Sequence, residues 1–231
     1  MKKSIFIICL FLFTNSSFAV EESNLVELNK IQKHINEVGT KILNSNKLEK
    51  RVIFTYSEKN KLEVLKNTDT LTKRQVVVYS DSYKNIETED ELAGYIAREI
   101  PTAIRSYEGL GNGWLSSVKL KAAPKKYELV FDKLAVDYMV KAGYNPLGLI
   151  TYINKSYPQA RQDRISAHNL TSKRLAYIYE RIYMKYPEFL INNTYLENYY
   201  YQNYLLTSLN NRLVTEKKAK NPEATKDLQY E

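Results

Sequence analysis

The pentapeptide Arg98-Glu99-Ile100-Pro101-Thr102 has the frame of an H-E-x-x-H zinc-binding helix. In that motif two histidines at i and i+4 share one helix face, and the glutamate between them activates water. Glu99 stands at the position of this glutamate, whereas Arg98 and Thr102 stand at the two histidine positions. Arginine has no lone pair to offer a metal. The spacing of a catalytic helix is therefore present without its histidines.

A second pair of carboxylates, Glu128 and Asp132, lies one turn apart on the same face of another predicted helix. If the two helices pack together, Glu99, Glu128 and Asp132 crowd one partly buried site. Buried carboxylates are costly unless they are paired. We therefore expect Arg98 to fork onto Glu128 or Asp132 as a bidentate partner, replacing the charge of a metal ion. The alternative is that Arg98 lies exposed on a solvated helix face.

The elements that must position these residues follow from apolar periodicity. Thr88 is a good N-cap for the helix that carries Glu99, with Glu91 as the partner of a capping box. Pro101 lies inside this helix and is expected to kink it or break it early. The pattern predicts an α+β fold that is mostly helical, with a small β-sheet. Helices are predicted over 24–43, 91–105, 127–142, 147–154, 173–186 and 195–214, and strands over 51–56 and 76–79.

The first nineteen residues predict a secretory signal peptide. Met1-Lys2-Lys3 is a basic start, residues 5–13 are apolar, and Ser17-Phe18-Ala19 is a small-x-small cleavage site. The apolar run is shorter than the ~20 residues that span a bilayer, which favours cleavage after Ala19 over a membrane anchor. We expect export, to a bacterial periplasm. The only cysteine, Cys9, lies inside this segment, so the mature chain is expected to lack disulfides.

The charge pattern gives little evidence for a charged partner. The net charge is +8, of which Lys2 and Lys3 contribute two, leaving +6 after cleavage. The lysines are interleaved with glutamates, which is typical of a solvated surface; loose attraction to anionic envelope components is the alternative. The export signal disfavours nucleic acid as a partner, and no later segment is long and apolar enough to predict a transmembrane helix.

The chain is expected to end in a tyrosine-rich helix and a tail. Four of the six residues from Tyr199 to Tyr204 are tyrosines, which either cover the core or form a partner surface. The charged residues 216–231 are predicted to be disordered. The predicted organisation is a signal peptide (1–19), a main domain (20–190), the tyrosine-rich helix (191–215) and the disordered tail (216–231).

Taken in order, several fragments resemble the soluble periplasmic members of the HtpX and CAAX-prenyl-protease type of zinc metallopeptidase (peptidase family M forty-eight). Residues 76–79 are similar to its strand, and Glu89-Asp-Glu-Leu-Ala-Gly-Tyr-Ile-Ala97 resembles the lead into its H-E-x-x-H. Glu128-Leu-Val-Phe-Asp132-Lys-Leu-Ala135 resembles its E-x-x-A-D run, and Ala142-Gly-Tyr-Asn-Pro146 its A-G-Y-D-P. His168-Asn-Leu-Thr-Ser-Lys-Arg174-Leu175 resembles its H-P-x-x-x-x-R-I. The likeness covers roughly residues 50 to 182.

The resemblance implies a zincin-like metallopeptidase domain followed by an extra C-terminal helix. It implies that Glu99 is the general base, Glu128 the third zinc ligand and Asp132 a carboxylate that supports a ligand histidine. It also implies that His168 and Arg174 lie beside the substrate site.

Three departures from the family pattern affect the zinc site. Arg98 and Thr102 replace the zinc histidines, Asn169 replaces the late proline, and the spacer between the two site helices is shorter than in most relatives. A catalytic zinc needs three protein ligands and an open position for water. Of the three ligand positions, only Glu128 still holds a residue that binds zinc.

The sequence therefore predicts a zinc-free pseudoprotease without a cofactor, which binds envelope proteins or peptides in a quality-control role. A peptide would lie beside its edge strand by strand addition. Two alternatives stay open. One is an active zinc metalloendopeptidase with Glu99 as base and an unusual ligand set, in which His168 joins Glu99 and Glu128. The other is a structural envelope protein that works through the tyrosine-rich helix.

Overall fold

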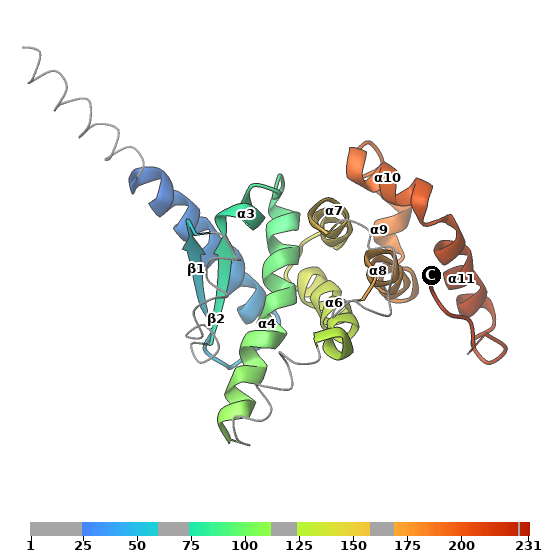
Figure 1. Ribbon diagram of the computed structural model, residues 1–231, viewed down its shortest axis with the longest axis horizontal. Coiled ribbons are helices and arrows are strands. Elements are labelled where there is room, and N and C mark those ends of the chain that lie inside the picture. Colours follow the sequence, from blue (N-terminus) through green and yellow to red (C-terminus); the bar gives the residue numbers. More distant parts are fainter. Residues whose placement is uncertain (1–24, 60–73, 112–123, 158–168, 226) are drawn as a thin grey trace, which may run out of the picture.

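The computed structural model describes residues 25–59, 74–111, 124–157, 169–225 and 227–231, except for the side chains of 106–111, 124 and 126. Helices predominate over a small parallel sheet, as the predicted α+β class requires (Figure 1). A helix over 25–45 comes first. The labelled elements that follow are β1 (Ile53–Ser57), β2 (Gln75–Tyr79), α3 (Ser80–Tyr83), α4 (Glu89–Gly111), α6 (Pro124–Lys141), α7 (Leu147–Ser156), α8 (Thr171–Lys185), α9 (Glu188–Ile191), α10 (Tyr199–Thr207) and α11 (Leu209–Lys220). Among these described residues, no helix is both long and apolar enough to cross a bilayer.

The sheet consists of β1 and β2, paired in parallel with Phe54 opposite Val76. The helix over 25–45 lies directly against β1. A Cβ atom added to Gly39 would lie 2.6 Å from the ring of Phe54, so only glycine allows this close approach. Val76 and Val78 of β2 are buried in the core, which continues into α4.

Side chains occupy part of both outer edges of the sheet. Ile53 donates its N–H to Arg74, so the backbone groups of Phe54 and Tyr56 point away from β2. Gln32 meets them there: its Nε2 donates to Phe54 O at 2.9 Å and its Oε1 accepts from Tyr56 N at 2.8 Å. The Gln32 amide thus makes the two bonds that one residue of a further parallel strand would make. On the β2 edge, the Tyr95 hydroxyl donates to Val77 O at 2.7 Å.

Helix α4 begins as predicted but continues further than predicted. Glu91 N donates to Thr88 Oγ1 at 3.2 Å, while the Glu91 carboxylate accepts from the backbone N–H of Glu87 at 2.7 Å. The prediction that the helix breaks early at Pro101 was wrong, because α4 runs through this residue to Gly111. Ile100 and Ala103 are buried on either side of the proline. Their packing holds the helix together despite the missing backbone donor.

Helices α4 and α7 approach each other closely near their N-termini. A Cβ atom on Gly148 would lie 2.6 Å from Asp90 Cβ, and one on Gly94 would lie 3.1 Å from Leu149 Cα. The buried Glu91 side chain links the pair by accepting from Thr151 Oγ1 at 2.7 Å and Lys155 Nζ at 2.8 Å. These contacts fix the N-terminal half of α4, which leads directly into the candidate site.

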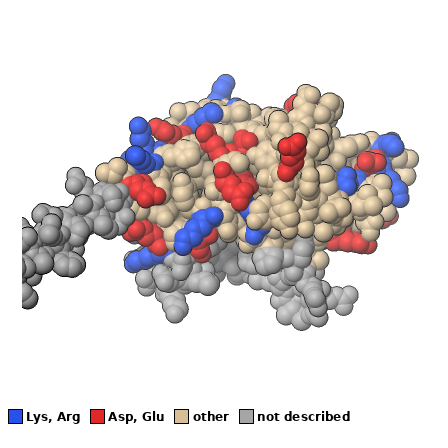
Figure 2. All heavy atoms as spheres, turned by 90° about the horizontal axis from the view of Figure 1, so that it is seen from above, with Lys and Arg blue, Asp and Glu red and all other residues tan. Residues whose placement is uncertain are grey.

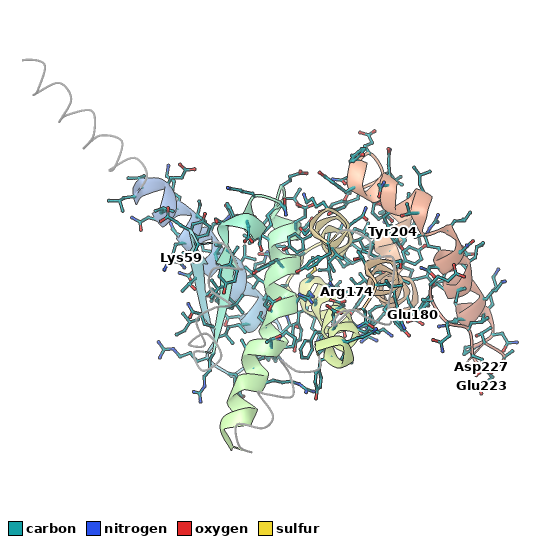
Figure 3. All side chains as sticks on the ribbon, viewed as in Figure 1. Lys59, Arg174, Glu180, Tyr204, Glu223 and Asp227 are labelled. Atoms are coloured by element: carbon teal, nitrogen blue, oxygen red, sulfur yellow. The ribbon has the colours of Figure 1, made fainter. Side chains whose placement is uncertain are left out.

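The C-terminal part differs from its prediction. The single helix expected over 195–214 is two helices, α10 and α11, which meet at Ser208. Tyr204, which Figure 3 labels, and Tyr201 are buried, while Tyr199 is 73% exposed. The tyrosines therefore both cover the core and reach solvent. The tail predicted to be disordered is helical to Lys220. Its Tyr230 is buried, with its ring 5.0 Å from that of Tyr177. One aromatic anchor provides apolar contact that the charged composition of 216–231 did not indicate.

Candidate functional site

Three helices bring five charged side chains together. Arg98 and Glu99 come from α4, Glu128 and Asp132 from α6, and Arg174 from α8, and these five residues are called the ion cluster below. Helix α6 packs against both α4 and α8 (Figure 1). Because Glu128 and Asp132 are one turn apart on α6, both carboxylates can meet arginines from either side. The predicted crowding of Glu99, Glu128 and Asp132 around Arg98 is confirmed.

Arg98 distributes its guanidinium over all three carboxylates. Its Nε donates to Asp132 Oδ1 at 2.9 Å and its Nη1 to Glu99 Oε1 at 2.9 Å. Its Nη2 lies 3.4 Å from Glu128 Oε1. The Arg98 side chain is only 15% exposed, so the alternative of an exposed, solvated Arg98 is wrong. The predicted ion pairing is confirmed, but each bond goes to a different carboxylate instead of forking onto one.

Arg174 makes the bidentate pair that was predicted for Arg98. Its Nε donates to Asp132 Oδ2 at 2.8 Å and its Nη2 to Asp132 Oδ1 at 2.9 Å. Its Nη1 lies 3.6 Å from Glu128 Oε1. Figure 3 labels Arg174 on α8, and both it and Asp132 are almost completely shielded from solvent. Parallel N–H bonds to a carboxylate are among the strongest polar contacts in proteins.

Asn169 completes the hydrogen bonding of Glu128. Its backbone N–H donates to Glu128 Oε2 at 2.8 Å and its side-chain Nδ2 donates to the same oxygen at 3.1 Å. A proline at this position could not donate the first of these bonds. Asn169, at the position where the motif that the sequence resembles has a proline, therefore supplies Glu128 with two donors. The sequence indicated this only through that difference from the motif.

The aromatic ring of Tyr157 covers the two arginines. Its centroid lies 5.0 Å from the Cζ of Arg174 and 5.9 Å from that of Arg98, within the range of cation–π attraction. Burial lowers the pKa of Arg98, but the charges of Asp132, Tyr157, Glu99 and Glu128 outweigh burial and raise the pKa overall. Arg98 is therefore a permanent cation here.

The ion cluster does not fit a zinc ion. Both oxygens of Glu128 and both oxygens of Asp132 already accept hydrogen bonds or ion pairs. A guanidinium lies where a ligand would have to approach Glu128, and it cannot itself bind a metal. Within the ranges that the structure describes, no three His, Cys, Asp or Glu side chains are grouped so as to hold a metal ion.

The structure does not bring the remaining predicted site residues together in one catalytic site. Thr102 is half-buried on α4, one turn beyond Arg98. His168, assigned by resemblance to a substrate site and to a substitute ligand set with Glu99 and Glu128, lies outside the described residues. Arg174, assigned to the same site, is instead buried in the ion cluster. Glu99 is the most accessible member of the ion cluster, with 27% of its side chain exposed.

Comparison with known proteins gives no match: no family model, no curated protein and no solved structure is significantly similar to this chain.

Proposed function

We propose that this chain is an exported, metal-free protein with a zincin-like domain, which binds envelope proteins or peptides without cutting them. One observation carries the proposal. The guanidinium of Arg98 contacts Glu99, Glu128 and Asp132, the three carboxylates that a resemblance to HtpX-type peptidases assigns to a zinc site. The cation among these carboxylates is therefore an arginine.

An arginine in this place neutralises the carboxylates but cannot perform the hydrolysis. A catalytic zinc lowers the pKa of its bound water to about 7 and polarises the scissile carbonyl. A guanidinium offers only N–H donors and no open coordination position. Glu99, whose Oε1 accepts from Arg98 at 2.9 Å, then has no metal-bound water to deprotonate. Binding of a peptide without turnover is the function that this chemistry supports.

The outer edge of β2 is the best place for such a peptide. Gln32 occupies the middle of the β1 edge with two hydrogen bonds, whereas on β2 Tyr95 occupies the carbonyl of Val77 with one. A peptide could add to β2 by displacing the Tyr95 hydroxyl from Val77 O. Burial, followed by the charge of Glu99, raises the pKa of Tyr95 well above its ordinary value, so the hydroxyl stays protonated and remains a donor.

Zinc analysis and one labelled client separate binding from catalysis. We expect the chain, purified without chelators, to contain substoichiometric zinc, to bind fluorescent casein by anisotropy and to leave it uncut. Glu99→Gln should leave casein binding unchanged. Stoichiometric zinc, together with casein cleavage that is lost in Glu99→Gln, would instead establish an active metalloendopeptidase.

A second variant tests the edge of β2. Tyr95→Phe removes the hydroxyl that occupies Val77 O and should tighten casein binding. Tyr199→Phe removes a hydroxyl from a residue that is 73% exposed and serves as the control. If casein binding by Tyr95→Phe is unchanged or weaker, the peptide does not bind at this edge.

A further inference from the structure

The outer side of α10 and its two flanks presents six exposed residues, called the α10 face below. On α10 itself Tyr199, Gln202, Asn203 and Leu206 occupy one stripe at i, i+3, i+4 and i+7, opposite the buried Tyr201 and Tyr204. Leu196 precedes this stripe and Leu209 follows it. Leu206 is 83% exposed and Tyr199 is 73% exposed. Such large apolar side chains in solvent indicate a contact surface when they lie together.

The α10 face lies in an almost uncharged part of the chain. From Phe189 to Asn211 the only charged residue is Glu197, although 26% of the whole chain is charged. Figure 2 looks onto the side of the molecule that carries α10 and shows a largely uncharged area, interrupted by a few acidic side chains, beside the charged side chains at the right-hand end. The cores of protein interfaces are depleted in charged residues and enriched in tyrosine.

The order of residues on the α10 face is the same from either end. Its midpoint falls between Gln202 and Asn203; Tyr199 and Leu206 lie three positions outward, and Leu196 and Leu209 three positions further. The sequence of chemistries is therefore apolar, apolar, amide, amide, apolar, apolar. When two copies of such a helix pair antiparallel about a two-fold axis, each position meets its mirror position. Leucine or tyrosine then meets leucine, and amide meets amide.

The hydrogen-bonding capacity of the two central amides is complementary in the same way. Gln202 Nε2 donates to Leu196 O at 3.0 Å, and Asn203 Oδ1 accepts from Asn154 Nδ2 at 3.2 Å. These bonds leave the Oε1 acceptor of Gln202 and the Nδ2 donors of Asn203 without a partner among the described residues. Across a two-fold axis, Asn203 of one copy can donate to Gln202 of the other, twice per pair.

We propose that the α10 face is a two-fold symmetric interface between two copies of this chain. Charge favours this face over the rest of the surface, because each copy carries a net charge of +8, or +6 without the predicted signal peptide. Like net charges repel, and an uncharged face lets two copies meet without opposing their lysines. The mirrored order of apolar and amide residues matches a second copy of the same face, whereas a partner of another kind does not require it.

Sedimentation equilibrium of the full chain over a range of concentrations tests the interface. We expect a reversible dimer whose dissociation constant rises roughly a hundredfold in Leu206→Glu, because each dimer contains the substitution twice. Val130→Glu is the matched control, since Val130 is 51% exposed on α6, away from the α10 face. A monomeric wild-type chain, or a Leu206→Glu variant that still dimerises normally, overturns the proposal.

A mixing experiment tests the two-fold symmetry itself. Tyr199→Lys and Leu206→Glu should each weaken dimerisation alone. When the two variants are mixed, the introduced charges of opposite sign face each other across one half of the interface, and a heterodimer should form. If the mixture stays monomeric while both single variants are folded by circular dichroism, Tyr199 does not face Leu206 and the two-fold arrangement is wrong.

Discussion

The Nε atom of Arg98 donates a hydrogen bond to Oδ1 of Asp132 at 2.9 Å, joining α4 to α6. Asp132 has no solvent exposure, and Arg174 holds its other side from α8. Three helices thus meet at one carboxylate with two permanent cations. A buried ion pair of this kind contributes little net stability, because desolvation offsets the attraction, but removing one partner leaves an uncompensated charge. The ion cluster therefore makes the packing of these helices depend on both arginines.

Arg98→Ala should destabilise the chain by about 3 kcal/mol, because Asp132 and Glu128 each lose a buried cationic partner while Arg174 remains. Urea unfolding followed by circular dichroism at neutral pH measures this difference. Lys33→Ala is the control: the Lys33 side chain is 78% exposed in its pair with Glu37. Exposed pairs contribute less than about 1 kcal/mol. An Arg98→Ala variant with an unchanged free energy of unfolding in urea would contradict the structural role of the ion cluster.

The elements with long periodic patterns were predictable from the sequence. Leu92, Ile96 and Ile100 recur at helical spacing and are fully buried in α4, and the β-branched run at Val76 forms β2. Their type depends on local periodicity, which a sequence shows directly. The prediction of a helix break at Pro101 was wrong, because tertiary packing on both sides of the proline outweighs the loss of one backbone hydrogen bond. The order in the tail depends on the burial of Tyr230, a long-range contact that periodicity does not reveal.

The candidate site was predictable only in part. The pairing of Arg98 with Asp132 or Glu128 was predictable, because three crowded carboxylates need a cation nearby. The bidentate role of Arg174 did not, because it depends on how α8 packs against α6. The donors that Asn169 supplies to Glu128 are set by the backbone just before α8. A spacing in sequence indicates which residues share a face, but not which face a third helix will meet.

Restoring both histidines should restore a metal site if the α4–α6 arrangement is that of a metallopeptidase. Arg98→His with Thr102→His places two imidazoles at i and i+4 on α4. The Glu128 carboxylate already lies within 3.4 Å of the Arg98 guanidinium. Two histidines and one glutamate are a known catalytic zinc set. We expect about one zinc per chain by metal analysis, with a melting temperature that rises when zinc is added.

Arg98→His alone is the control for this experiment, because with Thr102 unchanged only two ligands are present and zinc should be lost on dialysis. If the double variant is folded and still binds no zinc, the relative placement of α4 and α6 is not that of a zinc peptidase. The zincin-like part of the proposed function would then fail, while casein binding could still be measured independently.

Asp137 should make stability depend on acidity. Burial raises the pKa of this α6 carboxyl, but hydrogen bonds from Arg181 and Tyr186, with further help from Lys185, outweigh burial and lower the pKa below its ordinary 3.8. A lowered pKa in the folded state means that the unfolded chain binds the proton more readily. The stabilisation is therefore complete above the ordinary pKa and is lost as the pH falls through the folded value.

We accordingly expect Asp137→Asn to unfold at lower urea concentration than the wild-type chain at about pH 7, and the two to converge towards about pH 3. Asp81→Asn is a suitable comparison, because the Asp81 carboxylate accepts a local hydrogen bond from Ser82 N on the short α3. A wild-type advantage over Asp137→Asn that persists unchanged to about pH 2 would show that charge is not its source.

Gln32→Ala should open the outer edge of β1. The variant removes both bonds of the Gln32 amide, leaving Phe54 O and Tyr56 N without their partner. Each lost hydrogen bond costs about 1 kcal/mol, so unfolding should need about 1–2 kcal/mol less free energy. An unpaired strand edge is also a template for pairing with another chain. Light scattering on heating should therefore rise earlier for Gln32→Ala than for Lys33→Ala, its neighbour on the same helix. If the two variants scatter alike at temperatures equally far below their melting temperatures, Gln32 holds its helix against β1 but does not prevent another chain from pairing with the β1 edge.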